Sequence, residues 1–103
     1  MIAHYVLTAD AEADLREIVR YTRRQWGEAQ TRTYADKLVR GIERLVGGSR
    51  GFKDMTDLAP GLRMSRCEHH YIFCLSRKDA PALVVAILHE RMNLMARLAA
   101  RLG

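Results

Sequence analysis

The segment from Pro60 to Asn93 constrains the fold most, because it holds three consecutive runs typical of β-strands. Side chains alternate along residues 62–67 and again along residues 71–75, with an expected turn at residues 68–69 between these two strands. A second turn is expected at residues 78–81, and the run LVVAILH that follows is apolar enough to be a central strand buried on both faces. The segment therefore predicts an antiparallel meander.

Two helices are predicted before this sheet. Thr8 can cap the first helix, in which apolar side chains recur every three or four residues until Gly27. The same spacing begins again at Glu28 and stops at the glycine pair 47–48. Two helices joined by a tight glycine turn make an αα-hairpin. Trp26, beside that turn, is expected to be a core residue between the helices.

Shorter elements are predicted around the hairpin and the sheet. The run from Ile2 to Leu7 is expected to be a strand, and the loop of residues 47–61 connects the hairpin to the sheet. From Met92 to Leu102, apolar side chains return at helical spacing among arginines, which predicts a basic C-terminal helix. The loop residues expected to reach the core are Phe52, Met55 and Leu58.

The predicted fold class is α+β. We expect one domain over residues 1–103, in which the αα-hairpin packs on a small, mostly antiparallel sheet. The order of elements is β-α-α-β-β-β, followed by the short C-terminal helix.

Arginine dominates a basic composition. The chain has 17 lysine and arginine residues against 12 aspartate and glutamate residues, and its formal net charge is +5. Arginine-rich surfaces suit carboxylates, phosphates and acidic protein partners. No basic run is long enough to favour nucleic-acid binding over a solvated surface, so we expect no sequence-specific DNA binding by this chain alone. No signal peptide and no apolar segment of bilayer length are evident, so we expect a cytoplasmic protein without a membrane partner.

Residues that bind metals and phosphates are sparse. Cys67 and Cys74 are expected to be free thiols, on opposite faces if one continuous strand carries both. His69 and His70 are adjacent, and neighbouring strand residues point to opposite faces, so we do not expect them to share a metal ion. The glycine-rich motif GGSRG follows a helix and lacks the lysine of a phosphate-binding loop. We therefore expect no metal and no cofactor.

RNA cleavage is the enzymatic alternative that the residues leave open. A small basic fold needs a general base, a general acid and cations around the scissile phosphate, with the 2′-hydroxyl as nucleophile. Arg63, His89 and Arg91 could supply these groups if the strands present them on one concave surface. The other interpretation, which we favour, is a solvated strand arginine and a hydrogen-bonded histidine at a strand end.

Five segments resemble the ParE-type toxins of bacterial toxin–antitoxin modules, within the wider ParE/RelE superfamily. They are AEADLREIVRYTRRQWG in the first helix, the next helix with Tyr34, then PGLR, HYIFC, and AILHERMN before the closing helix. The resemblance extends nearly end to end. It implies a helical hairpin packed on a small, mostly antiparallel sheet whose N-terminal strand joins the C-terminal meander, which agrees with the pattern of the residues.

The resemblance implies a toxin that inhibits DNA gyrase, traps it on cleaved DNA and blocks replication, with growth inhibition and plasmid maintenance as consequences. It also implies neutralisation by a ParD-like antitoxin in a hetero-oligomer. Relatives that cut mRNA on the ribosome share the fold and place functional residues near Arg63 and His89. The tyrosine that they carry after the last strand is missing here, which favours the branch that is not a nuclease.

One residue departs from the family pattern: Asn93 stands where many ParE relatives have aspartate. A degenerate toxin that only binds and buffers its antitoxin is a third interpretation, beside the gyrase inhibitor and the ribosome-dependent endoribonuclease.

Candidate contacts follow from the resemblance and from the helical pattern. An amphipathic antitoxin helix can lie along the αα-hairpin and pair its acidic groups with exposed arginines. Ordinary core burial is the alternative for the apolar positions. The candidate antitoxin contacts are Leu15, Ile18, Arg20, Arg23, Arg24, Tyr34 and Leu38. The candidate target contacts, in the C-terminal segment, are Arg91, Met92, Arg97 and Arg101.

Overall fold

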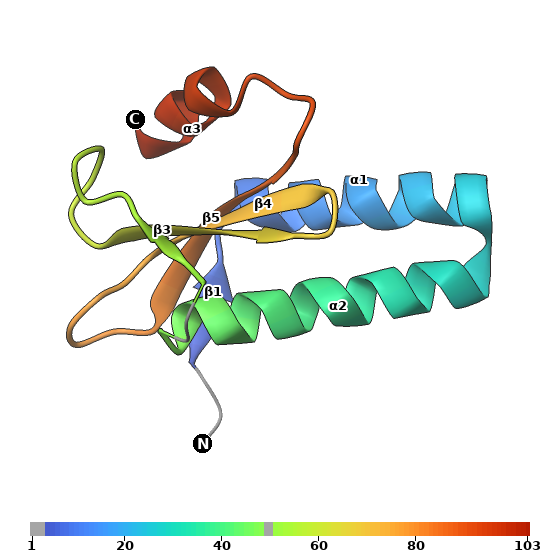
Figure 1. Ribbon diagram of the computed structural model, residues 1–103, viewed down its shortest axis with the longest axis horizontal. Helices are drawn as coiled ribbons and strands as arrows, with labels where there is room; N and C mark the ends of the chain where they lie inside the picture. The colour runs from blue at the N-terminus through green and yellow to red at the C-terminus, as the bar shows by residue number, and fades with distance from the viewer. Residues whose placement is uncertain (1–3, 49–50) are drawn as a thin grey trace.

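The structure is a computed structural model that describes residues 4–48 and 51–103 (Figure 1). Within these residues the elements are β1 (Tyr5–Leu7), α1 (Ala9–Trp26), α2 (Glu28–Val46), β2 (Lys53–Asp54), β3 (Leu62–Cys67), β4 (His70–Leu75), β5 (Ala82–His89) and α3 (Leu94–Leu102). The predicted order is confirmed, and β2 is an additional short strand inside the predicted loop. The start of the predicted first strand, residues 2–3, lies outside the described residues.

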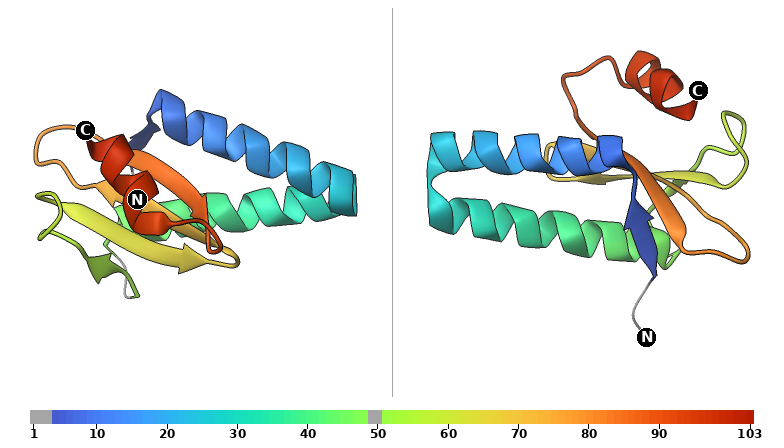
Figure 2. Two further views of the ribbon diagram at one scale, coloured as in Figure 1. Left: turned by 90° about the horizontal axis from the view of Figure 1, so that it is seen from above. Right: turned by 180° about the vertical axis from the view of Figure 1, so that it is seen from behind.

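The strands form one mixed sheet in the order β1-β5-β4-β3-β2. β1 runs parallel to β5, and the other neighbouring strands are antiparallel. The hairpin of α1 and α2 covers one face of the sheet, and α3 covers the other (Figure 1 and Figure 2). This arrangement confirms the α+β fold, with the N-terminal strand joined to the C-terminal meander.

The hairpin begins and turns where the sequence indicates. Thr8 Oγ1 accepts a hydrogen bond from the backbone N–H of Ala11 at 3.0 Å, which caps α1. Gly27 joins the two helices with φ of +86°, a conformation that glycine adopts far more readily than other residues. With 18 and 19 residues, the helices are about 27 Å long at 1.5 Å per residue. Their joined ends project beyond the sheet (Figure 1 and Figure 2).

Trp26 is not a core residue, contrary to the prediction. Its side chain is 67% exposed, and Tyr21 is 59% exposed. Trp26 ends α1, whose joined end projects beyond the sheet (Figure 1 and Figure 2), and both side chains line one cleft. The helical spacing identifies an apolar face, but the length of the sheet decides where burial along that face stops.

Apolar side chains fill both faces of the sheet. On the hairpin side, buried leucine and isoleucine residues of α2 pack against Ile72. On the other side, Leu98 of α3 packs in a cluster with Phe73. α2 approaches the sheet closely at Gly41, where a Cβ atom would lie 3.1 Å from the Cys67 sulfur. A larger residue at this position would therefore require the neighbouring side chains to shift by a few tenths of an ångström.

The two cysteines are buried free thiols on the same face of the sheet, because two strands rather than one continuous strand carry them. The β3–β4 turn separates them, so Cys67 ends β3 and Cys74 lies on β4. Burial raises the pKa of Cys74 to about 11 and also raises the pKa of Cys67. Both thiols are therefore protonated at neutral pH and are poor nucleophiles.

The predicted C-terminal helix is confirmed, but its buried face differs from the prediction. Leu94, Leu98 and Leu102 pack at a spacing of four residues, whereas Met95 is 49% exposed and Met92 precedes the helix. Of the loop residues predicted to reach the core, Met55 is buried, Phe52 is half-buried and Leu58 is 52% exposed.

Strand β5 has an open edge beyond β1. The two strands pair only at Ala82–Val84, so the rest of β5 has no strand neighbour on that side. Val85 is a β-bulge, because Val84 and Ala86 pair with consecutive residues of β4. Backbone groups beyond Val84 therefore need partners that are not strands.

Asp14 of α1 and Arg101 of α3 supply those partners. The guanidinium donates two hydrogen bonds of 2.8 Å to the carboxylate and one of 3.0 Å to the Val85 carbonyl. Asp14 also accepts a hydrogen bond from the Ile87 N–H at 3.0 Å. The Asp14 side chain is only 15% exposed, and the Arg101 side chain is 19% exposed. Bonding to Asp14 raises the pKa of Arg101 above its usual value. One ion pair thus joins α1, β5 and α3.

We predict that Asp14→Ala lowers the free energy of unfolding by about 2 to 4 kcal/mol, because it leaves Arg101 with only the longer and exposed pair to Asp10, at 3.8 Å, and leaves the Ile87 N–H unpaired. Glu12→Ala is the matched control, since its pair with Arg16 is exposed and spans 3.9 Å; its loss should cost less than about 0.5 kcal/mol. Urea denaturation followed by circular dichroism measures both values. Equal losses would contradict a structural role for the Asp14–Arg101 pair.

Candidate functional site

A cleft of about 560 Å³ opens where the hairpin projects past the end of the sheet. Its walls come from both helices, from the β3–β4 turn and from the residues at the end of β5. Apolar and aromatic side chains form one part: Ile18, Tyr21, Trp26, Tyr34 and Met92. Polar and charged side chains form the rest: Glu17, Thr22, Gln30, Lys37, Glu68, His69, His70, His89 and Arg91.

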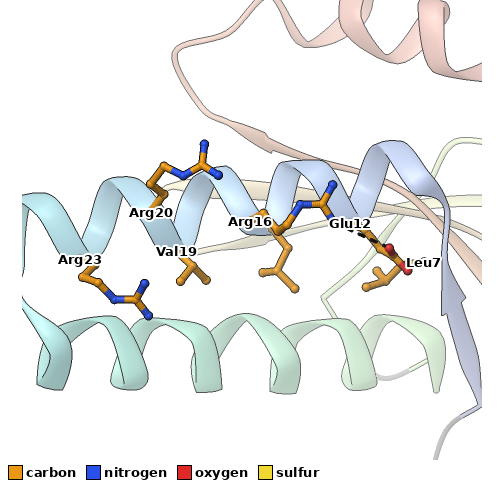
Figure 3. A pocket seen from close by; sticks show the side chains of 7 residues that line it. Leu7, Glu12, Arg16, Val19, Arg20 and Arg23 are labelled. Carbon is orange, nitrogen blue, oxygen red and sulfur yellow. Dashed lines mark ion pairs between the residues drawn. The ribbon is translucent and has the colours of Figure 1, made fainter.

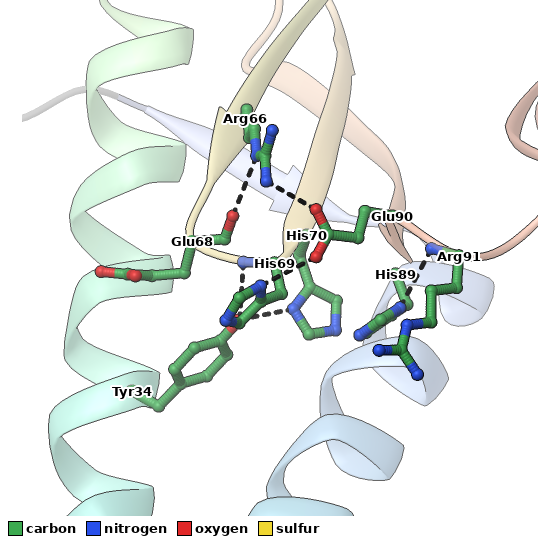
Figure 4. A network of polar contacts seen from close by, with 8 residues as sticks. All are labelled: Tyr34, Arg66, Glu68, His69, His70, His89, Glu90 and Arg91. Carbon is green, nitrogen blue, oxygen red and sulfur yellow. Dashed lines mark hydrogen bonds and ion pairs between the residues drawn. The ribbon is translucent and has the colours of Figure 1, made fainter.

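A hydrogen-bond network fixes the imidazole of His70 in the cleft. The Tyr34 hydroxyl lies 2.6 Å from His70 Nδ1 and accepts a hydrogen bond from the His69 backbone N–H at 3.3 Å (Figure 4). We assign the hydroxyl proton to the bond with Nδ1, so the neutral ring carries its own proton on Nε2. His70 therefore presents an N–H donor on the side away from Tyr34.

The His89 ring takes the same tautomer. Its Nδ1 accepts a hydrogen bond from the Arg91 backbone N–H at 3.1 Å, which places the ring proton on Nε2 (Figure 4). The centroids of the His70 and His89 rings are 5.1 Å apart in an edge-to-face arrangement. The His69 ring stacks near His89 at 6.5 Å. Three histidines from two strand ends thus meet at one end of the sheet.

Burial, with smaller contributions from the neighbouring His89 and His69 rings, lowers the pKa of His70 to about 4. Burial also raises the pKa of Tyr34. Both groups are therefore neutral at pH 7. Within residues 4–48 and 51–103, no three His, Cys, Asp or Glu side chains lie together in a way that could hold a metal ion.

Ion pairs hold the β3–β4 turn against its neighbours. Glu90 accepts hydrogen bonds from Arg66 at 2.6 Å and from His69 at 2.8 Å, and the His69 bond is the main cause that lowers the pKa of Glu90. Lys37 of α2 pairs with Glu68 at 3.1 Å. Glu68 has φ of +55°, which is uncommon for a residue other than glycine. Contacts from α2 and from the end of β5 hold this turn in place, so the side of the cleft that the turn forms has a fixed position.

The predicted antitoxin contacts divide between two surfaces. Ile18 and Tyr34 line the cleft. Leu15, Arg20 and Arg23 line a groove of about 570 Å³ along α1, together with Leu7, Glu12, Arg16 and Val19 (Figure 3). Arg24 is exposed. Leu38 is fully buried, so it belongs to the core and to no surface of the isolated chain.

The predicted target contacts also divide. Arg91 and Met92 lie at the cleft, and Arg97 is exposed on α3. Arg101 is engaged with Asp14, which leaves it little freedom to contact a target.

The nuclease candidates lie in two places. His89 and Arg91 both line the cleft, whereas Arg63 stacks over the Phe52 ring at 4.7 Å and pairs in the sheet with Cys74. His89 pairs with His70 at the other end of the sheet, about 13 Å away from Arg63 along the strands at 3.3 Å per residue.

Sequence reasoning missed the gathering of aromatic and imidazole rings at the cleft. The HHY motif places two histidines at a turn, and His89 ends the last strand, but their proximity depends on strand register. The sequence predicts Trp26 as a core residue. Its exposure follows from the projection of the hairpin past the sheet, which no local sequence pattern indicates.

Comparison with known proteins identifies the family. A family model described as the ParE toxin of the type II toxin–antitoxin system parDE matches residues 5–94. The chain is 68% identical over 98 residues to a Toxin ParE of Escherichia coli, with 95% of each chain covered. It is 30% identical over 93 residues to a Toxin ParE1 of Mycobacterium tuberculosis, covering 90% of this chain and 95% of the relative.

A solved structure agrees in fold. The chain matches one described as the chromosomal ParDE TA system from P. aeruginosa, with a TM-score of 0.65, 17% identity, and coverage of 85% of this chain and 96% of that chain. A helical hairpin on a small mixed sheet is thus an architecture already seen in a solved structure. The chain belongs to the ParE family, as a toxin of a type II toxin–antitoxin system. None of the helices that the structure describes is long and apolar enough to cross a membrane.

We predict that His70 makes stability depend on pH. The folded-state pKa of about 4 lies below the ordinary value of 6.5, so the unfolded chain binds the extra proton between these values. The contribution is fully present above pH 6.5 and is lost as the pH falls towards 4, by about 3 kcal/mol. His70→Asn keeps an acceptor for Tyr34 but does not titrate. Urea denaturation from pH 7.5 to 4 should give the variant a shallower pH dependence, and parallel curves would contradict the assignment.

Proposed function

We propose that this toxin inhibits DNA gyrase and that direct binding of a ParD-like antitoxin neutralises it. The observation that carries the proposal is the match of the ParE family model to residues 5–94, which include the hairpin, the whole sheet and the cleft. Gyrase inhibition and ParD binding are the activities that the family resemblance implies. The structural features below support each of them.

The groove along α1 supports antitoxin binding. Leu7, Leu15 and Val19 form an apolar floor, and arginines border it along the same helix (Figure 3). An amphipathic helix can bury its apolar face in such a groove while acidic residues at its margin meet the arginines. The net charge of +5 also favours an acidic partner.

The segment after β5 supports contact with the target. Arg91, Met92 and Arg97 are exposed. Asn93 caps α3 by accepting a hydrogen bond from the Ala96 N–H at 3.3 Å, a role that aspartate fills equally well. The exchange of aspartate for asparagine therefore preserves the start of the helix. The ion pair of Arg101 holds α3 on the sheet, which fixes where Arg97 points.

The distance between Arg63 and His89 counts against RNA cleavage as the activity. A general base and a cation must act on one scissile phosphate, and these two residues lie at opposite ends of the strands. The endoribonuclease remains an outcome that the experiment below distinguishes.

We predict that the purified protein inhibits supercoiling by DNA gyrase and accumulates linear DNA from cleavage complexes. Arg97→Glu should weaken inhibition about tenfold, because it reverses a charge on the target-facing surface. Arg77→Glu, an exposed charge in the β4–β5 loop, should leave it unchanged. Supercoiling and cleavage assays on purified gyrase measure these effects.

Other outcomes assign other functions. Cleaved transcripts without DNA breaks, abolished by His89→Ala in a folded protein, would replace the gyrase proposal with the endoribonuclease. Normal growth during expression, with the antitoxin still bound, would indicate a degenerate toxin.

A further inference from the structure

The cleft at the end of the sheet gathers hydrogen-bond donors. His70 and His89 each carry a proton on Nε2, as their Nδ1 contacts require. The Arg91 guanidinium lies beside the His89 ring, and all three side chains line the cleft (Figure 4). Two neutral N–H donors and one permanent cation suit a single oxyanion.

The carboxylates near these donors have other partners. Glu90 binds Arg66 and His69, and Glu68 binds Lys37. Glu17, at the far wall, pairs with Arg20. Among the described residues, no carboxylate forms an ion pair with Arg91. The donors of the cleft are therefore available to an acidic group from outside the chain.

Apolar side chains lie beside the donors in the same cleft. Trp26 is 67% exposed, Tyr21 59% and Met92 42%. Large exposed apolar side chains gathered in one cleft are typical of protein-binding sites. A ligand that fills the cleft thus needs an apolar part next to its acidic group.

These features favour a peptide over a nucleic acid. A phosphodiester backbone carries a charge at every nucleotide, whereas of the two Lys and Arg side chains that line the cleft, Lys37 is paired with Glu68 and Arg91 remains to bind a single anion. A peptide can present one carboxylate to Arg91 and an apolar side chain to Trp26. The mixed charges of the cleft do not oppose it.

We propose that the cleft binds an acidic residue of the antitoxin together with an apolar side chain next to it. Arg91 pairs with the carboxylate, His70 and His89 donate hydrogen bonds to it, and Trp26 covers the apolar side chain. The assignment rests on the proposed neutralisation by an antitoxin and adds a second contact to the groove along α1. Because Arg91 and Met92 also belong to the target-facing segment, an occupied cleft withdraws both from the target.

Trp26 is the single tryptophan of the chain, so it can report occupancy of the cleft. The toxin is labelled with fluorotryptophan, and its one fluorine NMR signal is followed while unlabelled cognate antitoxin is added. We expect the signal to move as the exposed indole becomes buried. Calorimetry on the same samples measures binding by itself. Binding without any change in the signal would overturn the cleft assignment and leave the proposed function intact, whereas absence of binding would contradict the proposed function.

A double-mutant cycle tests the acidic residue. Arg91→Ala should weaken antitoxin binding about ten- to a hundredfold, the usual effect of losing a charged hydrogen bond. Arg77→Ala, in the loop at the other end of the sheet, is the matched control and should have no effect. One Asp→Asn or Glu→Gln substitution in the antitoxin should cause a similar loss with the unmodified toxin and little further loss with Arg91→Ala.

The cycle also has contrary outcomes. Additive losses for every antitoxin carboxylate would overturn the pairing with Arg91. A fluorine signal that moves with oligothymidine and not with antitoxin would replace the peptide with a nucleic acid as the ligand. Circular dichroism of each variant separates a lost contact from a lost fold.

Discussion

The Asp14–Arg101 ion pair is the interaction on which the arrangement of the other elements depends. β5 lies at the centre of the chain's contacts, yet β1 pairs with only its first three residues. The bulge at Val85 and the free edge beyond it would leave buried backbone groups without partners. A carboxylate from α1 and a guanidinium from α3 satisfy them together. The hairpin, the sheet and the C-terminal helix are thereby held in one geometry.

The position of the hairpin relative to the sheet creates the cleft. The joined ends of α1 and α2 project past the end of the sheet (Figure 1 and Figure 2). Aromatic side chains near these ends therefore remain exposed. The β3–β4 turn closes one side of the resulting space, where Tyr34 and Glu90 position the histidines. Apolar side chains of the hairpin thus lie beside hydrogen-bond donors at the strand ends.

The chain belongs to the ParE toxin family, and the side chains described above form both the groove along α1 and the cleft. The groove along α1 and the cleft lie on different parts of the hairpin, so one elongated partner can reach both. Residues first assigned to separate partners, Ile18 and Arg91, line the same cleft. Arg63 lies about 13 Å from His89 along the strands, outside this cleft.

The sequence by itself determined the elements and their order, because hydrophobic period, the Thr8 cap, the Gly27 turn and the strand alternation are local signals. The burial of β5 on both faces was equally readable from its composition. Only the tertiary structure decided which side chains meet: the exposure of Trp26, the shared face of Cys67 and Cys74, the histidine cluster and the pairing of Arg101 with Asp14. These depend on strand register, on the bulge at Val85 and on the position of the hairpin relative to the sheet. Such contacts join residues far apart in the chain, and no local pattern carries that information.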